Sequence, residues 1–317
     1  MATVFAIQVV HAEREKAEAA IDQALDEIER LEALLSEWNP DSDISKINAS
    51  AGLHPVEVGE EALVVVQAGL RVSEWSGGAF DLTWAALRGA YDFRPGLERA
   101  PTDEELAARL PKINWRDVLV DPARKTVFLK RKDMAIGTGA IAKGYALDRA
   151  SAILRAAGLK SFMLFGGGQV QVHGTKQGRP WRVGVQHPRQ GSAYFGFVEA
   201  TDGSVSTSGD YEHAFIDASG KRYHHLLDPR TGRSAERSYS ATVLAPEGIY
   251  SDSLSTALFI LGPTKGLPML ESLPFEAAAV VVSADCTLTL NEAAKKLFVP
   301  RLDLDEAGRL PHCQGKP

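Results

Sequence analysis

The chain has 317 residues and a mass of 34.2 kDa, which is enough for a sizeable core and suggests roughly two domains, or one domain with two lobes. Its formal net charge of -6 argues against a nucleic-acid partner, because binding a phosphate backbone needs a concentrated basic surface. No apolar run approaches the roughly 18 residues of a membrane span. Cys286 and Cys313 allow at most one disulfide and lack the spacing of a zinc site, so the redox compartment stays open.

The N-terminal half begins with a strand and two helices. Residues 3–10 alternate apolar and polar side chains like a half-buried strand, whereas residues 13–38 repeat apolar side chains with a helical period. A second helix is expected over residues 60–74. Thr102 is expected to cap a short acidic helix, with Glu105 as its capping-box partner.

The second half is rich in short strands bounded by turns. A Gly-rich turn at residues 137–144 (GTGAIAKG) opens a helix, and residues 251–262 (SDSLSTALFILG) form another. Strands are expected at DVLVD, TVFLK, SFMLF, QVQVHG, WRVGVQH, AYFGFVEA, HAFID, SYSATVLA and AAAVVVS. Because helices and strands are mixed without regular alternation, the predicted fold class is α+β.

Two glycine-rich segments could approach a ligand closely. In GTGAIAKG, glycines permit close backbone approach and Lys143 could neutralise a phosphate, although the spacing fits neither a P-loop nor a dinucleotide fingerprint. FGGGQ at 165–169 follows an apolar strand, and either a ligand against bare backbone or a bulge or tight crossing would explain it.

Polar side chains also gather at 206–212 (STSGDYE) and 222–232 (RYHHLLDPRTG), which are expected outside the strands. His225 could act as a general base or phosphate ligand near neutral pH, or could be a structural residue.

The helix at 251–262 begins with oxygen-bearing side chains. Asp252 and Thr256 are four residues apart and therefore share one helix face. Ser251 or Asp252 could cap the helix while Thr256 bonds back to a carbonyl one turn earlier. Alternatively, the carboxylate and the hydroxyl could bind Mg²⁺, which prefers such oxygen ligands.

Taken in order, GTGAIAKGYALD, LFGGG, TSGDYE, HHLLDPRTG and SDSLSTALFILG resemble the motifs of the ApbE family of FAD:protein FMN transferases. The resemblance extends through MATVFAIQV, LSEWNPDSDISKIN and GGAFDLTWAAL, and covers residues 1–299. It implies one transferase domain over 1–299, with a two-lobed, T-fold-like architecture and an active site in the cleft between the lobes. Residues 300–317 are polar and are expected to form a loosely held tail.

The resemblance implies a reaction. FAD would bind with Mg²⁺ at its pyrophosphate, and FMN would be transferred to a Thr or Ser hydroxyl of an acceptor flavoprotein, releasing AMP. A membrane-bound redox subunit is one candidate acceptor. Two alternatives remain open: an FAD pyrophosphatase that gives FMN and AMP, and a non-catalytic FAD-binding protein.

The resemblance also assigns site residues by motif position. Asp252, Thr256 and a backbone carbonyl near Ala140 would bind the metal. The expected catalytic residues are Asp252 and His225, with His225 as the general base. The residues expected to contact FAD are Trp38, Asp81, Lys143, Asp148, Gly166, Gly167, Ser208, Gly209 and Thr231. Trp38 would stack on a ring system, with core packing as the alternative.

This chain departs from the family pattern at two positions. Gly137 stands where relatives commonly carry Asp, so one acidic group is missing, and Gly168 stands where they commonly carry Asn. The location of the protein also stays open. It would be periplasmic, or on the outer face of the cytoplasmic membrane, if a leader had been trimmed, and cytoplasmic if the chain were complete.

Overall fold

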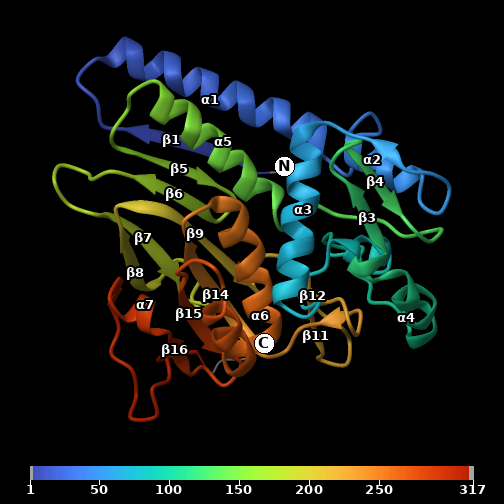
Figure 1. Cartoon of the computed structure of the whole chain (residues 1–317). Helices are drawn as coiled ribbons and strands as arrows, with labels where there is room; N and C mark the ends of the chain where they lie inside the picture. Colours follow the sequence, from blue (N-terminus) through green and yellow to red (C-terminus); the bar gives the residue numbers. More distant parts are fainter. Residues whose placement is uncertain (1–2, 314–317) are drawn as a thin grey trace.

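An antiparallel sheet forms the centre of the structure, a computed structural model that describes residues 3–313 (Figure 1). Within those residues the sheet has seven strands. In order across the sheet they are β1 (Phe5–Val9), β5 (Phe162–Gly166), β6 (Gln169–His173), β9 (Asp202–Gly209), β14 (Ser238–Ala245), β15 (Ala278–Ser283) and β16 (Leu288–Leu290). The predicted α+β class is therefore confirmed.

Helices cover one face of this sheet and enclose the larger hydrophobic core (Figure 1). They are α1 (Arg14–Leu35), α3 (Glu60–Trp75), α5 (Ala142–Ala156) and α6 (Gly248–Glu271). Helix α6 packs against β9 and β14 on one side and against α5 and α3 on others. Residues 248–262 of α6 are almost all buried, which explains why the stretch after Thr256 is apolar all round, since a helical segment enclosed on every side has no polar face.

A smaller sheet of β7 (Trp181–Gln186), β8 (Tyr194–Ala200) and β17 (Phe298–Pro300) packs on the other face and forms a second core. The remaining helices and strands flank these layers, and several of them add buried side chains to the two cores. They are α2 (Asp43–Ala49), β2 (Val56–Glu57), α4 (Asp103–Arg109), β3 (Val118–Asp121), β4 (Thr126–Leu129), β10 (Ala214–Ile216), β11 (Arg222–His224), β12 (Leu227–Asp228), β13 (Arg233–Ser234) and α7 (Glu292–Lys295). The predicted capping box of Thr102 and Glu105 is confirmed at the start of α4.

The expectation that STSGDYE lies outside the strands is wrong for its first half. Ser206, Thr207 and Ser208 belong to β9, which pairs with β6 and β14 near the middle of the sheet. Its hydroxyls find partners across the sheet and on α6, as in the 2.8 Å bond between the hydroxyls of Thr207 and Thr242. A polar strand can therefore be central, because each buried hydroxyl is hydrogen-bonded.

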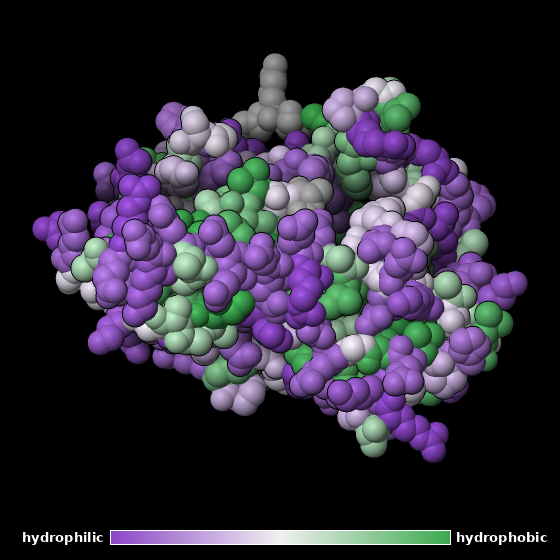
Figure 2. Space-filling view, turned by 90° about the horizontal axis from the view of Figure 1, so that it is seen from above, coloured by the Kyte–Doolittle hydropathy of each residue, from purple (hydrophilic) through white to green (hydrophobic). Residues whose placement is uncertain are grey.

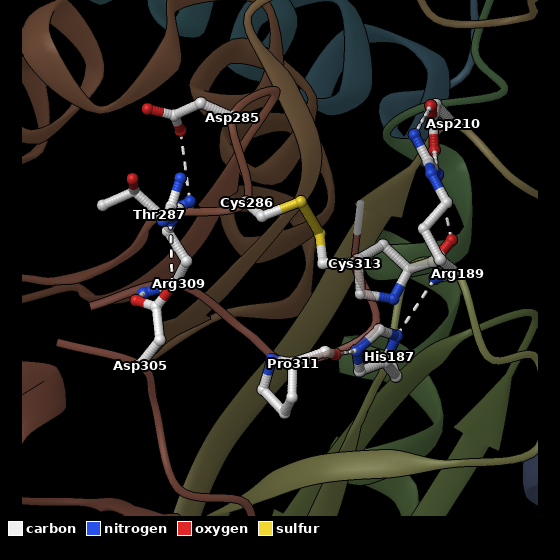
Figure 3. Close-up of a disulfide and its surroundings, with 11 residues drawn as sticks. His187, Arg189, Asp210, Asp285, Cys286, Thr287, Asp305, Arg309, Pro311 and Cys313 are labelled. Atoms are coloured by element: carbon white, nitrogen blue, oxygen red, sulfur yellow. Dashed lines mark hydrogen bonds and ion pairs between the residues drawn. A yellow bond between two sulfur atoms is a disulfide. The ribbon is translucent and has the colours of Figure 1, made fainter. Parts of the chain in front are cut away.

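The expected loose tail is also wrong for residues 300–313, while 314–317 lie outside the described residues. Cys286 and Cys313 form a disulfide with their Cα atoms 5.7 Å apart (Figure 3). Leu310 is buried, and its backbone N–H donates to the carbonyl of Cys286 at 3.0 Å. The Pro311 carbonyl lies 2.9 Å from Nε2 of His187. Polar composition misled the prediction because one buried leucine and one disulfide suffice to fasten the segment.

Removing the disulfide is expected to destabilise the fold. The bond closes a loop with a sequence separation of 27 residues, for which chain entropy predicts a loss of about 3–4 kcal/mol. Urea unfolding of the Cys286→Ala/Cys313→Ala double variant beside the parent measures the change. Equal unfolding midpoints and slopes would show that the disulfide contributes nothing to stability.

None of the helices within residues 3–313 combines the length and the apolar character needed to cross a bilayer. Figure 2 shows a mostly hydrophilic face interrupted by small hydrophobic areas.

Candidate active site

The starts of helices α5 and α6 cross at two glycines. A Cβ on Gly144 would lie 2.0 Å from the carbonyl oxygen of Gly248, and a Cβ on Gly248 would lie 2.5 Å from that of Gly144. Only glycine permits this approach of two backbones. The crossing places Lys143, in the first turn of α5, beside Asp252, in the second turn of α6.

At this crossing Asp252 contacts α5. Its Oδ1 and Oδ2 lie 3.1 and 3.2 Å from Nζ of Lys143, and Oδ2 accepts a bond of 3.2 Å from the N–H of Gly144. Lys143 Nζ also donates to the carbonyl of Gly139 at 2.8 Å. Helix α6 begins at Gly248, so the expectation that Ser251 or Asp252 caps it is wrong.

The cap comes from Asp148 on α5. Its two carboxylate oxygens accept the N–H groups of Gly248 and Ile249 at 2.6 and 2.8 Å. Because these are orphan donors of the first turn, Asp148 acts as an N-cap supplied by another helix. Its contact with FAD stays a prediction.

Burial raises the pKa of Asp148 to about 6, against the opposing effect of the N–H bonds from Gly248 and Ile249. The folded protein therefore holds this proton more tightly than the unfolded chain, whose ordinary pKa is 3.8. Stability contributed by Asp148 should increase as the pH falls through 6 towards 3.8. We expect the parent to gain about 1 kcal/mol over Asp148→Asn when the pH is lowered from about 7.5 to about 5.

Urea unfolding of both proteins at the two pH values measures this difference. An identical pH dependence in the two proteins would contradict the raised pKa.

Strand β9 places the hydroxyl of Ser208 against α6, about one turn after Asp252. The hydroxyl of Ser208 lies 2.9 Å from that of Ser255 and 3.2 Å from that of Thr256. Thr256 therefore faces β9, and the hydroxyl that bonds back to the carbonyl of Asp252 is that of Ser255. Gly209 follows directly, and a Cβ there would lie 2.3 Å from the ring of Tyr211.

His225 follows β11 and lies against His213. Their ring centroids are 5.2 Å apart in an edge-to-face arrangement, and the N–H of His225 donates to the carbonyl of His213 at 3.1 Å. Burial lowers the pKa of His225 to about 4, and the charge of Lys143 contributes to this shift. Its Nδ1 is buried and lacks a hydrogen-bond partner within residues 3–313. His225 is therefore a neutral imidazole near neutral pH, with one nitrogen unpaired.

The glycines of FGGGQ have a structural explanation. Gly166 pairs with Gln169 across a hairpin, and the two residues between them, Gly167 and Gly168, have φ values of 54° and 82°. These values fit the tight type I′ turn that favours glycine. A Cβ on Gly166 would also lie 2.5 Å from the ring of Phe5. Contact of Gly166 or Gly167 with FAD stays a prediction.

The alternative that Trp38 packs in the core is wrong, because its side chain is 78% exposed. The guanidinium of Arg88 lies over its ring, 5.2 Å from the centroid, and Arg88 pairs with Glu37 at 2.7 Å. One face of an exposed indole is thus held by a cation. Stacking on FAD stays a prediction.

Glu37 fills the space beside Gly137, the position at which relatives commonly carry Asp. A Cβ on Gly137 would lie 2.6 Å from Oε2 of Glu37, which accepts the N–H of Thr138 at 2.9 Å. A carboxylate from the end of α1 therefore occupies the space into which a side chain at position 137 would extend. Sequence reasoning missed it because no local pattern links residues 100 positions apart.

Asp81 and Thr231 are two other residues expected to contact FAD. Within the described part of the chain, neither forms a hydrogen bond with Lys143 or Asp252. Asp81 is buried and accepts bonds from Thr83 and from the N–H of Trp115 as it caps the 3₁₀ helix Leu82–Leu87, and burial raises its pKa. Thr231 is exposed in the turn between β12 and β13. Contacts of both with FAD stay predictions.

The oxygen atoms around the Lys143 ammonium are of the kind that binds a hard cation. Among the residues that the structure describes, no cluster of three or more His, Cys, Asp or Glu side chains could hold a metal. The Lys143 ammonium instead lies between the carboxylate of Asp252 and the carbonyl of Gly139, which shows that these oxygens accommodate positive charge. One carboxylate with neutral oxygens fits Mg²⁺ bound together with a phosphate group.

Known proteins resemble this chain along most of its length. An FAD:protein FMN transferase of Treponema pallidum is 33% identical over 84% of this chain and 78% of its own length. One from Klebsiella pneumoniae is 30% identical over 93% and 91%. The crystal structure of an ApbE protein from Thermotoga maritima matches with a TM-score of 0.84 at 29% identity, covering 93% of this chain and 98% of that one. Since the ApbE family model also matches residues 1–281, the chain belongs to the ApbE family.

Proposed function

We propose that this protein transfers FMN from FAD to a hydroxyl group of an acceptor flavoprotein and releases AMP. The observation that carries the proposal is the ion pair of Lys143 and Asp252 at the crossing of two helix starts, with Ser208, Thr256 and His225 nearby. Proteins of similar sequence along nearly the whole chain are named FAD:protein FMN transferase.

Phosphoryl transfer asks little covalent chemistry of a protein, which must position the reactants and neutralise developing charge. When bound, Mg²⁺ would supply part of that neutralisation at the pyrophosphate, held by Asp252, Thr256 and a backbone carbonyl. That carbonyl is Ala140 by motif position, while the structure turns the adjacent Gly139 carbonyl towards Lys143.

The remaining steps fall to this chain's own side chains. Lys143 would move its ammonium from Asp252 to a phosphate oxygen as FAD binds, a short movement for a flexible side chain. Neutral His225 would accept the proton of the acceptor hydroxyl as that oxygen attacks the phosphorus of the FMN portion. The bond from that phosphorus to the bridging oxygen of the pyrophosphate would break, and AMP would leave with that oxygen on its phosphate.

The acceptor and the compartment follow from the same proposal. The acceptor would be a flavoprotein with an exposed Thr or Ser motif, and a membrane-bound redox subunit is one candidate. The disulfide of Cys286 and Cys313 favours an oxidising compartment, such as the periplasm or the outer face of the cytoplasmic membrane. Blocking of free thiols during rapid lysis, followed by mass measurement, would test whether the bond exists in the cell.

Three readouts distinguish transfer from its alternatives. The protein is incubated with FAD, Mg²⁺ and an acceptor fragment that carries an Asp-x-x-Ser/Thr-Gly-Ala/Ser-Thr segment, and AMP, free FMN and labelled acceptor are followed. Labelled acceptor with equal AMP supports transfer. Free FMN with AMP would indicate a pyrophosphatase, and bound, unchanged FAD would indicate a binding protein.

A further inference from the structure

A groove of about 740 Å³ lies beside the hairpin of β10 and β11, apart from the residues assigned to FAD. One wall is β10 with the residues after it, and the other is the segment 98–101. The lining residues are Glu98, Ala100, Pro101, Ala214, Phe215, Ile216, Asp217, Ala218 and Tyr223. Its volume lies within the range of roughly 300–1,000 Å³ that is typical of ligand sites.

The wall formed by β10 offers free backbone groups. Within the described part of the chain β10 pairs with β11 alone. The N–H of Asp217 donates to Lys221 and the N–H of His225 donates to His213, so residues 213, 215 and 217 direct their backbone groups towards β11. Because antiparallel pairs alternate, Ala214 and Ile216 direct theirs away from β11, towards the outer edge. An unpaired edge of this kind can accept another strand.

Both walls of the groove are held in place. Aromatic contacts join the hairpin to residues 91–93, with ring centroids of Phe93 and Phe215 5.6 Å apart and those of Tyr91 and Tyr223 6.4 Å apart. Arg99 fastens the facing segment by donating to the carbonyls of Gly89 and Ala90. The groove therefore exists before any partner binds, which lowers the entropic cost of binding.

The groove leads to the candidate general base. Ala214 follows His213 directly, and His213 is paired with His225. A chain extended along the outer edge of β10 would lie one strand spacing, about 4.8 Å, from that strand. Its next residue beyond Ala214 would then lie opposite His213, whose ring contacts that of His225 on the side of β11.

We propose that this groove binds the acceptor protein as an extended segment that adds a strand to β10 and brings its Thr or Ser hydroxyl to the His213–His225 pair. The inference rests on the proposed transferase function. Main-chain hydrogen bonds to Ala214 and Ile216 would supply affinity, as in other cases of strand addition.

The groove can be blocked chemically in a folded protein. Both native cysteines are in the disulfide, so Ile216→Cys, at a side chain that is 44% exposed, introduces one reactive thiol. The variant is assayed before and after alkylation with a polyethylene glycol maleimide. Leu119→Cys on β3, where the native side chain is 48% exposed, is alkylated as the matched control.

Alkylation at position 216 is expected to lower transfer at limiting acceptor concentration by about 10-fold or more, through a higher KM for the acceptor, with FAD affinity unchanged. The Leu119→Cys control should transfer equally before and after. Parent-like transfer by the alkylated Ile216→Cys protein would overturn the groove, and so would an equal loss of FAD binding. Failure of the unmodified parent to label any acceptor would reject the transferase function itself, and the groove proposal with it.

Discussion

Asp252→Asn is expected to reduce Mg²⁺-dependent release of AMP by about 10²-fold or more. The substitution keeps nearly the same shape but exchanges an anionic ligand for a neutral amide. Thr256→Val, which deletes only a hydroxyl, should lower turnover by about 10-fold or more for the same reason. AMP release measured against Mg²⁺ concentration checks both, and each variant should need more Mg²⁺ than the parent.

The matched control is Ser253→Ala on the same helix. The Ser253 hydroxyl is buried and bonds back to the carbonyl of Ile249 at 2.7 Å, away from Lys143 and Ser208. Its loss should leave the Mg²⁺ dependence unchanged. A thermal melt of each variant separates lost chemistry from lost stability, because Asp252→Asn also breaks the ion pair with Lys143. Parent-like activity in both Asp252→Asn and Thr256→Val would show that this helix start has no role in metal binding.

His225→Ala is expected to lower FMN transfer by about 10²–10⁴-fold while FAD affinity changes little, because a general base acts on the acceptor hydroxyl. The pH profile tests the same role. With a pKa of about 4, His225 is neutral above about pH 5, so kcat/KM should be flat from there to neutral pH. It should fall as the pH approaches 4, where the imidazolium can no longer accept a proton.

His213→Ala supplies a control that keeps His225 and is expected to raise its pKa. Both burial and the charge of His213 lower the pKa of His225, so removing that ring should move the acidic limb to higher pH. His224→Ala should mainly reduce stability, because its Nε2 lies 2.9 Å from the Ala235 carbonyl and its ring packs on Phe259. Transfer at the parent rate by His225→Ala would mean that His225 is structural.

Local sequence patterns predicted much of the fold. Periodicity located the helices that became α1 and α3, and the capping box at Thr102 is formed as expected. The order of the motifs along the chain indicated the family without any knowledge of tertiary contacts. These features depend on residues close together in the chain, which is why sequence alone reaches them.

Partners far apart in the chain were the ones missed. The cap of α6 is Asp148, 100 residues before Gly248, so the nearer Ser251 and Asp252 looked like better candidates. Strand β9 looked like a loop because its hydroxyls are satisfied only by distant strands and by α6. Glu37 reaches the space beside Gly137 from the end of α1. In each case a tertiary contact overrode the local preference.

The intact mass of the acceptor after incubation with this protein tests the central claim most directly. With FAD and Mg²⁺ present, we predict that the acceptor gains the mass of one FMN less one water, in step with AMP release. Fragmentation should locate the addition on a single Thr or Ser, and replacing that residue by Ala should abolish it. An acceptor of unchanged mass, while FAD is converted to free FMN and AMP, would contradict the account.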